Sequence, residues 1–152
     1  MPANTPISDD TRTALVCDGS VERQGAAQGA LEDLGYSVQI AESPDDVSDK
    51  LKYGQYDVVY LHDNFGGGNS ENNEVLEIIQ SMPISARRKT FVVLAGTNYA
   101  TFDHMAAFSE SVNIVIKEAD MPEIKTILKK SIPTNYLFYK VYNEILRESG
   151  RA

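Results

Sequence analysis

Two side chains that could take part in chemistry, those of His62 and Asp63, lie at the end of a largely apolar run that covers residues 56–61. Three glycines at 66–68 follow closely. An apolar strand that ends in polar groups and a glycine-containing loop is typical of the carboxyl edge of a parallel sheet, where open α/β proteins place their sites. The sequence therefore predicts a site at this edge that offers an imidazole and a carboxylate.

The ends of the other apolar runs supply the rest of a candidate pocket. A cysteine and an aspartate end the first run, a threonine follows the fourth, and a lysine ends the fifth. The carboxyl ends of parallel strands meet at one edge of a sheet, so these side chains are expected to converge. The candidate pocket comprises Cys17, Asp18, His62, Asp63, Thr97 and Lys117.

Short β-branched and apolar runs alternate with amphipathic segments along the chain. The expected strands cover residues 13–17, 36–40, 57–61, 91–95 and 112–116. The expected helices cover residues 22–34, 44–53, 74–82 and 102–108, with another that starts near 120. Strands that are each followed by a helix predict a parallel sheet covered on both faces. The half-polar second strand suits a sheet edge, which gives a flavodoxin-like doubly wound (βα)5 fold with strand order 2-1-3-4-5.

Composition narrows the class of protein. The 152 residues include 42% hydrophobic residues, which is enough for one globular core. The formal net charge of −8 argues against non-specific nucleic-acid binding and against docking on an anionic membrane. No apolar stretch approaches the roughly 20 residues that span a bilayer. A single cysteine forms no internal disulfide and suits a reducing cytoplasm.

Three segments are expected. Residues 1–12 are polar and lack the apolar core of a secretory signal, so they are interpreted as a disordered leader or linker. Residues 13–132 form the main domain, and residues 133–149 form an additional amphipathic helix. That helix either folds back onto its own domain or binds a protein partner or a second copy in a homodimer. Its candidate interaction residues are Leu137, Val141, Tyr142 and Ile145.

Residues 13–132 resemble the receiver domain of bacterial two-component response regulators, the CheY-like family. The order and spacing of the strand ends carry the resemblance. Val16-Cys17-Asp18 stands where the family has its acidic pair. Residues 57–62 stand where the family has an aspartate, four apolar residues and then the phosphoaccepting aspartate. Residues 115–117 match the fifth strand, which ends in the family's lysine.

The resemblance implies a particular phosphorylation apparatus, of which this sequence retains only part. In receivers three carboxylates hold Mg²⁺ and the third accepts the phosphoryl group, while a hydroxyl and a lysine hold the phosphate. Asp18 and Lys117 match the second acid and the lysine. Cys17 replaces the first acid, His62 replaces the acceptor, and Ala95 falls at the hydroxyl position. Imidazole is a poor ligand for magnesium, so these changes disfavour ordinary aspartyl phosphorylation.

Two further positions depart from the family pattern. Ile114 stands where the family has a switching aromatic residue, and Glu118 stands where it has proline. Asp63 lies one residue beyond the acceptor position, and a shift of one residue reverses side-chain direction in a strand. A loop that turns Asp63 back into the pocket would make it a phosphoacceptor, with Asp18 and Asp63 as ligands for Mg²⁺ and with Thr97 and Lys117 holding the phosphate.

Three functions are therefore open at the level of sequence. The first is a divergent pseudo-receiver: a cytoplasmic, non-enzymatic signalling module of the phosphorelay type that acts through protein–protein contacts and needs no cofactor. The second is an atypical receiver that is phosphorylated on Asp63 with Mg²⁺. The third is a flavodoxin-like small-ligand binder or enzyme that uses the glycine loop, although this loop lacks the lysine and hydroxyl of a phosphate-binding motif.

Overall fold

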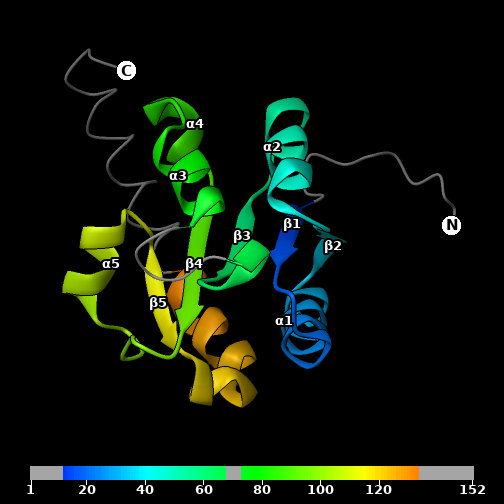
Figure 1. The fold of residues 1–152 in the computed structure, drawn as a ribbon. Helices are drawn as coiled ribbons and strands as arrows, with labels where there is room; N and C mark the ends of the chain where they lie inside the picture. Colours follow the sequence, from blue (N-terminus) through cyan, green and yellow to red (C-terminus); the bar gives the residue numbers. More distant parts are fainter. Residues whose placement is uncertain (1–11, 68–72, 134–152) are drawn as a thin grey trace, which may run out of the picture.

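Five parallel strands form a single sheet at the centre of the molecule (Figure 1). The computed structural model describes residues 12–67 and 73–133. The strands are β1 (Arg12–Cys17), β2 (Tyr36–Ile40), β3 (Val58–His62), β4 (Phe91–Gly96) and β5 (Ile114–Lys117). Their order in the sheet is β2-β1-β3-β4-β5. The predicted flavodoxin-like topology, with the half-polar second strand at an edge, is therefore confirmed.

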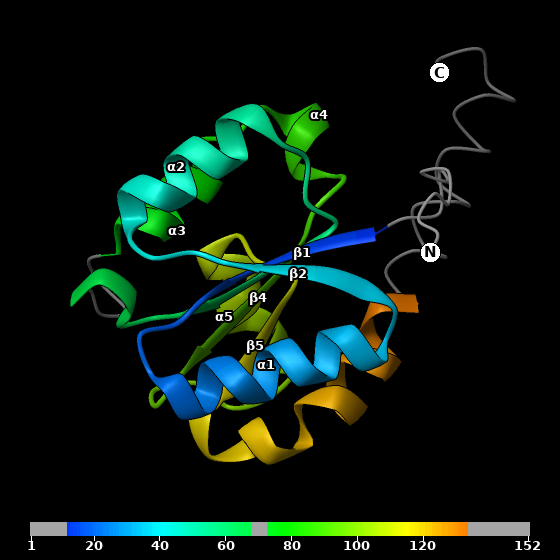
Figure 2. The ribbon, with the colours of Figure 1, turned by 90° about the vertical axis from the view of Figure 1, so that its right-hand side faces the viewer.

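Helices cover both faces of this sheet (Figure 2). They are α1 (Val21–Asp33), α2 (Pro44–Tyr53), α3 (Glu74–Gln80), α4 (Ile84–Arg87) and α5 (His104–Glu110), with the 3-10 turns η1 (Phe65–Gly67) and η2 (Glu118–Glu123). A final described helix covers residues 124–133. The additional helix expected over residues 133–149 lies, apart from residue 133, outside the described residues, and so do all its candidate interaction residues. None of the helices within the described part of the chain is long and apolar enough to cross a membrane.

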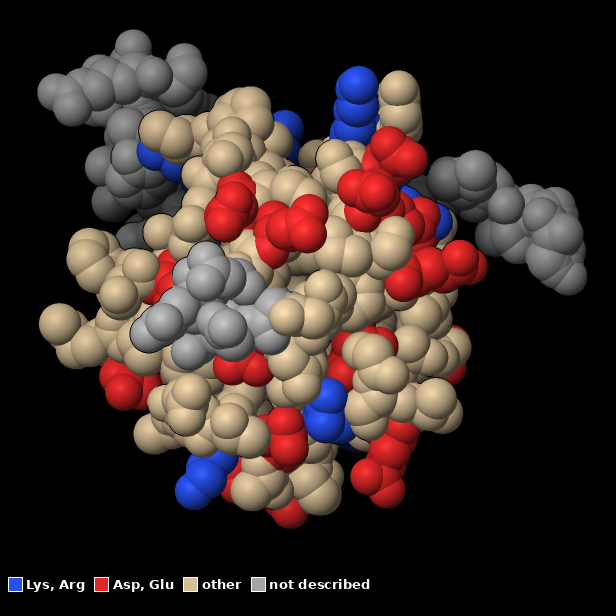
Figure 3. Space-filling model, in the orientation of Figure 1, with Lys and Arg blue, Asp and Glu red and all other residues tan. Residues whose placement is uncertain are grey.

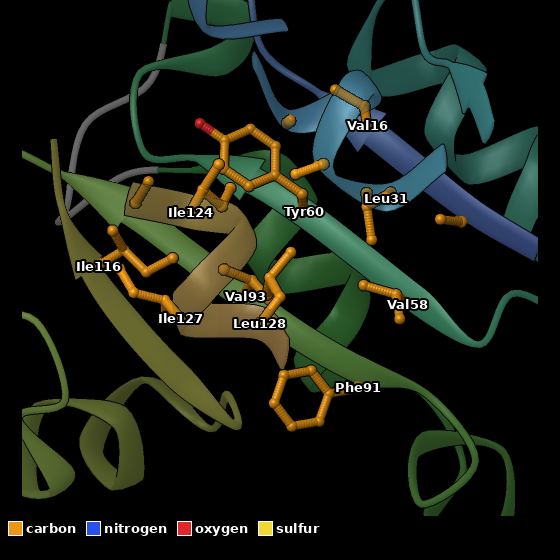
Figure 4. Close-up of a cluster of buried hydrophobic side chains, with 14 of the residues drawn as sticks. Val16, Leu31, Val58, Tyr60, Phe91, Val93, Ile116, Ile124, Ile127 and Leu128 are labelled. Carbon is orange, nitrogen blue, oxygen red and sulfur yellow. The ribbon is translucent and has the colours of Figure 1, made fainter. Parts of the chain in front are cut away.

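The sheet separates two hydrophobic cores because neighbouring residues of a strand face opposite sides. On one side, α1 and the helix at 124–133 pack against alternate strand residues such as Val58, Tyr60 and Val93, as Figure 4 shows. On the other side, α2, α3 and α5 pack against the residues between them, such as Val59 and Leu61. By this alternation the side chain of His62 belongs to the same side as Tyr60, and Asp63 to the opposite side.

Side-chain caps fix where the main helices begin. Ser43 accepts a hydrogen bond from the backbone N–H of Asp46 at 3.1 Å, and Pro44 occupies the first turn. Asn73 caps α3 in the same manner, by accepting from Leu76 N at 2.9 Å. A cap of this kind contributes about 1 kcal/mol, so these residues set the register of the helices that flank the site.

Several boundaries differ from the expected ones by one or two residues. The third strand ends at His62 and not at Leu61. The fifth strand begins at Ile114. Just before it, Asn113 Oδ1 accepts a hydrogen bond from the backbone N–H of Val92 at 2.8 Å, and this side-chain bond takes the place of a backbone bond between the two strands. The short helix α5 begins two residues later than expected because Asp103 caps it.

The sequence pattern misses one element, the single turn of helix α4. This turn positions Arg87, whose guanidinium donates to the carbonyl oxygens of Thr90 and Ser111, each at 2.8 Å, and to Asn113 Oδ1 at 3.0 Å. Arg87 thereby links the start of β4 to the turn that precedes β5.

Replacing Arg87 with alanine is expected to lower the free energy of unfolding by about 1–3 kcal/mol, because three acceptors lose a charged donor. Urea denaturation monitored by circular dichroism measures this change. Lys89→Ala is the matched control, since Lys89 is exposed and carries the same charge two residues away; its effect should stay within about 0.5 kcal/mol. Equal effects of the two variants would contradict the proposed role of Arg87.

Candidate functional site

A buried carboxylate, that of Asp18, lies at the carboxyl end of β1 and is 1% exposed. Its Oδ1 accepts from Ser20 N at 2.9 Å and from Arg23 Nη2 at 3.0 Å. Its Oδ2 accepts from Arg23 Nε at 2.9 Å and from the Tyr60 hydroxyl at 2.8 Å. A carboxylate offers about four lone-pair positions, so protein donors use the whole acceptor capacity of Asp18.

Arg23, near the start of α1, places a positive charge beside Asp18. We refer to this part of the site, at the end of β1, as the corner. Its two-pronged contact with Asp18 is the strongest arrangement for a guanidinium–carboxylate pair. A third nitrogen, Nη1, lies 3.5 Å from Glu118 Oε1, the residue that follows β5. The burial of Tyr60 and its bond to the charged Asp18 raise the pKa of the phenol, so its hydroxyl stays a donor.

His62 ends β3 and is 1% exposed, and both nitrogens of its ring have partners. Nδ1 accepts the backbone N–H of Asn64 at 3.2 Å, so the ring proton resides on Nε2. Nε2 lies 2.6 Å from Glu118 Oε1 and donates to it. The imidazole therefore connects the loop after β3 to the turn after β5 as a doubly hydrogen-bonded group.

Asp63 is held against the end of β4. Its backbone N–H donates to Ala95 O at 2.9 Å, and its carbonyl accepts from Asn73 Nδ2 at 2.7 Å. The carboxylate packs against Gly96, where an added Cβ would overlap it, and Oδ1 lies 3.4 Å from His62 Nδ1. Burial raises the pKa of this carboxyl group, while His62 acts in the opposite direction and Glu118 reinforces the increase.

The remaining candidate residues do not join this network through their side chains. Thr97 and Lys117 are exposed, and the amine of Lys117 forms no ion pair with any described residue. The backbone N–H of Lys117 donates to Thr101 Oγ1 at 2.9 Å, and Thr101 donates to Asp120 at 2.6 Å. Thr101, four residues after Thr97, is therefore the hydroxyl that contacts the end of β5.

The donor set does not fit a magnesium ion. Mg²⁺ requires several oxygen ligands in near-octahedral geometry. The carboxylate oxygens of Asp18 already accept hydrogen bonds from protein donors. Two of these donors belong to the guanidinium of Arg23, which lies directly beside the carboxylate. Cys17 is fully buried in the core beside α2 and α3, and burial raises the pKa of its thiol. The described residues include no group of three or more acidic, histidine or cysteine side chains arranged for a metal.

Three members of the network, Arg23, Tyr60 and Glu118, were not predicted as site residues. Arg23 follows Asp18 by five residues, which places it on the first turns of the helix that follows the strand. Tyr60 stands two residues before His62, and this spacing places it on the same side of the sheet. Glu118 was identified only as a departure from the family pattern. Strand periodicity could have identified Tyr60, whereas only the fold brings Glu118 to His62.

Structural comparison identifies this fold as that of CheY-like receiver domains. A response regulator receiver domain protein from Methanospirillum hungatei JF-1 matches with a TM-score of 0.63 and 10% identity, over 83% of this chain and 97% of that one. Chemotaxis response regulator CheY4 of Vibrio cholerae matches with a TM-score of 0.61 and 17% identity, over 82% and 98%. No protein-family model and no curated protein matches the sequence.

A third similar structure provides a direct contrast at the site. The receiver domain of sensor histidine kinase PA1611 from Pseudomonas aeruginosa PAO1 was solved with a magnesium ion coordinated in its active-site cleft. It matches with a TM-score of 0.61 and 14% identity, over 81% of this chain and 98% of that one. At identities this low the likeness concerns the fold, so the chemistry of this chain follows from its own side chains.

The raised pKa of Asp63 predicts a pH-dependent effect of Asp63→Asn. A carboxyl group whose folded-state pKa is raised contributes stability at low pH, and that contribution is lost as the pH rises through the folded pKa. The uncharged amide avoids this loss. The variant should therefore gain stability relative to the native chain between about pH 4, the ordinary aspartate pKa, and neutral pH.

Urea midpoints at pH 4 and pH 7 measure this difference. Asp49→Asn, which changes an exposed aspartate of α2, should show no such gain. A stability difference between Asp63→Asn and the native chain that is the same at both pH values would contradict the expected result.

Proposed function

We propose that the chain is a receiver-like signalling module that acts through protein–protein contacts and operates without ordinary aspartyl phosphorylation. The receiver fold supports the general class, a signal-transduction receiver module. The proposed lack of ordinary aspartyl phosphorylation follows from the chain's own residues. We further propose that the module is cytoplasmic, is not an enzyme and needs no cofactor.

One observation carries the proposal: the side chain at the end of β3 is a histidine with both nitrogens engaged. The resemblance puts the phosphoacceptor at this position, where His62 pairs in register with Ala95 and not with a hydroxyl residue. Phosphoryl transfer to a carboxylate needs cations to neutralise the charge that gathers on both partners. His62 instead bonds to the carboxylate of Glu118, which adds negative charge there.

The geometry of Asp63 also disfavours the atypical receiver. Its carboxylate is mostly buried against Gly96, and the Lys117 amine makes no ion pair with it. Burial raises its pKa, which opposes the charged form that a phosphoacceptor uses as a nucleophile. An Asp63-dependent adduct would nevertheless establish this second function, so it is an outcome of the test below.

Exposed apolar side chains at α5 support a protein-binding surface there. Met105 is 77% exposed and Phe108 is 82% exposed, one helical turn apart, and Phe102 lies just before the helix. We refer to these three residues as the α5 apolar surface. The hydrogen bond from Phe102 N to Val115 O, at 3.0 Å, fixes the loop that carries Phe102. Exposed apolar side chains that adjoin one another are typical of protein-binding sites.

The charge of the molecule restricts the class of partner. Figure 3 shows Asp and Glu spread over the face it presents, with Lys and Arg at only a few places. This distribution agrees with the net charge of −8 and disfavours polyanions such as nucleic acids. A protein that offers apolar side chains to the α5 surface is the partner that we propose, and a second copy of the chain is one such protein.

Treatment with acetyl phosphate and Mg²⁺ should add no phosphoryl group to the native protein, because neither His62 nor Asp63 is presented as a nucleophile with a neutralising cation. Intact-mass spectrometry, with hydroxylamine to cleave any acyl phosphate, measures the result. A phosphorylatable receiver domain, treated in parallel, shows that the reagent is active.

A hydroxylamine-sensitive adduct on the native chain would refute the proposal. If that adduct disappeared in Asp63→Asn and persisted in His62→Ala, the chain would be an atypical receiver that is phosphorylated on Asp63.

The α5 apolar surface predicts weak self-association that the double variant Met105→Ser/Phe108→Ser removes, because these exposed side chains lose apolar area on contact with a second copy. Sedimentation velocity over a range of concentrations measures it. Tyr53→Ser is the control, since Tyr53 is 80% exposed at the end of α2, which lies on the opposite side of α3 from α5 in Figure 1. A native chain that stays monomeric throughout, or a control that dissociates equally, would contradict a self-contact at α5.

A further inference from the structure

The corner at the end of β1 contains a positive charge supplied by the chain itself. The side chain of Arg23 is 20% exposed, and that of Asp18 is fully buried. An ionised carboxylate buried in this way is costly unless a cation and hydrogen-bond donors compensate it. Arg23 provides the cation and two of the four donors.

The geometry of this pair leaves a second cation no free lone pair on Asp18. A metal ion would need a free lone pair on Asp18, but Ser20, Tyr60 and the two guanidinium nitrogens occupy all the available positions. Glu118 is a second acid that contacts Arg23. Its Oε1 accepts from His62 and lies 3.5 Å from Arg23 Nη1, so this carboxylate oxygen is also engaged.

The guanidinium also connects distant parts of the chain. Asp18 follows β1, whereas Glu118 follows β5 at the far side of the sheet order. Arg23 contacts both carboxylates, and His62 at the end of β3 contacts the same oxygen of Glu118. The ends of β1, β3 and β5 are therefore linked by side chains alone.

We propose that the Arg23 guanidinium is a built-in cation that takes the place of a divalent metal ion in this corner. The corner is consequently indifferent to Mg²⁺ and Mn²⁺, and it holds the ends of β1, β3 and β5 in one arrangement. The inference rests on the proposed function only in treating the corner as the counterpart of a receiver's metal site. A planar, permanently charged fork suits this task better than a lysine, whose point charge forms no two-pronged contact.

The test uses Mn²⁺, which broadens the NMR signals of nearby nuclei. In the native protein, Mn²⁺ should leave the backbone amide signals of Gly19 and Ser20 unaffected. Arg23→Gln removes the charge and retains most of the stem. This variant should admit the ion, and the two signals should broaden at a Mn²⁺ concentration at least about tenfold lower than any that affects the native chain.

Three variants complete the design. Asp18→Asn combined with Arg23→Gln should abolish the broadening, because the metal loses its carboxylate. Arg23→Lys keeps a positive charge in the corner and should exclude Mn²⁺ as the native chain does. Lys125→Ala breaks an exposed ion pair with Asp33, at 3.4 Å, and should match the native chain. The amide spectrum of each variant reports whether it has folded.

Two results would overturn the inference. One is Asp18-dependent broadening in the native protein, which would show that Arg23 does not exclude the metal. The other is a folded Arg23→Gln variant that is as insensitive to Mn²⁺ as the native chain. If Arg23→Gln does not fold, broadening in the folded Arg23→Lys variant overturns the inference and its absence supports it. Either result is separate from the acetyl phosphate experiment, since a protein that binds Mn²⁺ and still gains no phosphoryl group would leave the proposed function intact.

Discussion

The buried carboxylate of Asp18 sets the constraint on which the rest of the site depends. A charge with 1% exposure must be matched within the protein, and Arg23 matches it with two hydrogen bonds. This pairing fixes the first turns of α1 against β1. The backbone N–H of Ser20 donates to the same carboxylate, and the Ser20 hydroxyl accepts from Arg23 N at 3.3 Å, so the helix cap and the ion pair support each other.

From Asp18 and Arg23 the hydrogen-bond network extends to the ends of β3 and β5. Glu118 is drawn to the guanidinium and to the His62 ring, and the ring in turn accepts the backbone N–H of Asn64. Each buried polar group therefore has a partner, and no buried side-chain nitrogen or oxygen among the described residues lacks one. A network satisfied in this way rigidifies its surroundings, which suits a module that presents one surface and does not switch by phosphorylation.

The fold and the site give different information about function. The sheet order and the helix layers are those of receiver domains. However, Arg23 pairs with Asp18 at the end of β1, and a histidine, His62, ends β3. A fold is a scaffold on which unrelated chemistries occur, so the side chains at the site decide the function. Here they support our proposal of binding in place of phosphoryl transfer, with the α5 apolar surface as the proposed location.

The architecture could be predicted from local patterns in the sequence. Apolar runs such as 91–95 and the half-polar strand 36–40 predicted five strands in the order that the structure confirms, because periodicity is a local property. The strand alternation also indicated that His62 and Asp63 face opposite sides. Element boundaries were less accurate, since long-range contacts such as that between Asn113 and Val92 decide them.

The hydrogen bonds and ion pairs within the site could not be predicted in the same way, because they depend on the packed fold. The sequence placed Asp18 and Lys117 in one pocket, but it did not indicate that Arg23, and not Lys117, pairs with Asp18. Nor did it reveal that Glu118 meets His62, because the two are 56 positions apart and belong to the ends of different strands. Spacing along the chain specifies which residues reach the edge of the sheet. Which of them bond to one another depends on distances of a few ångströms that only the packed fold establishes.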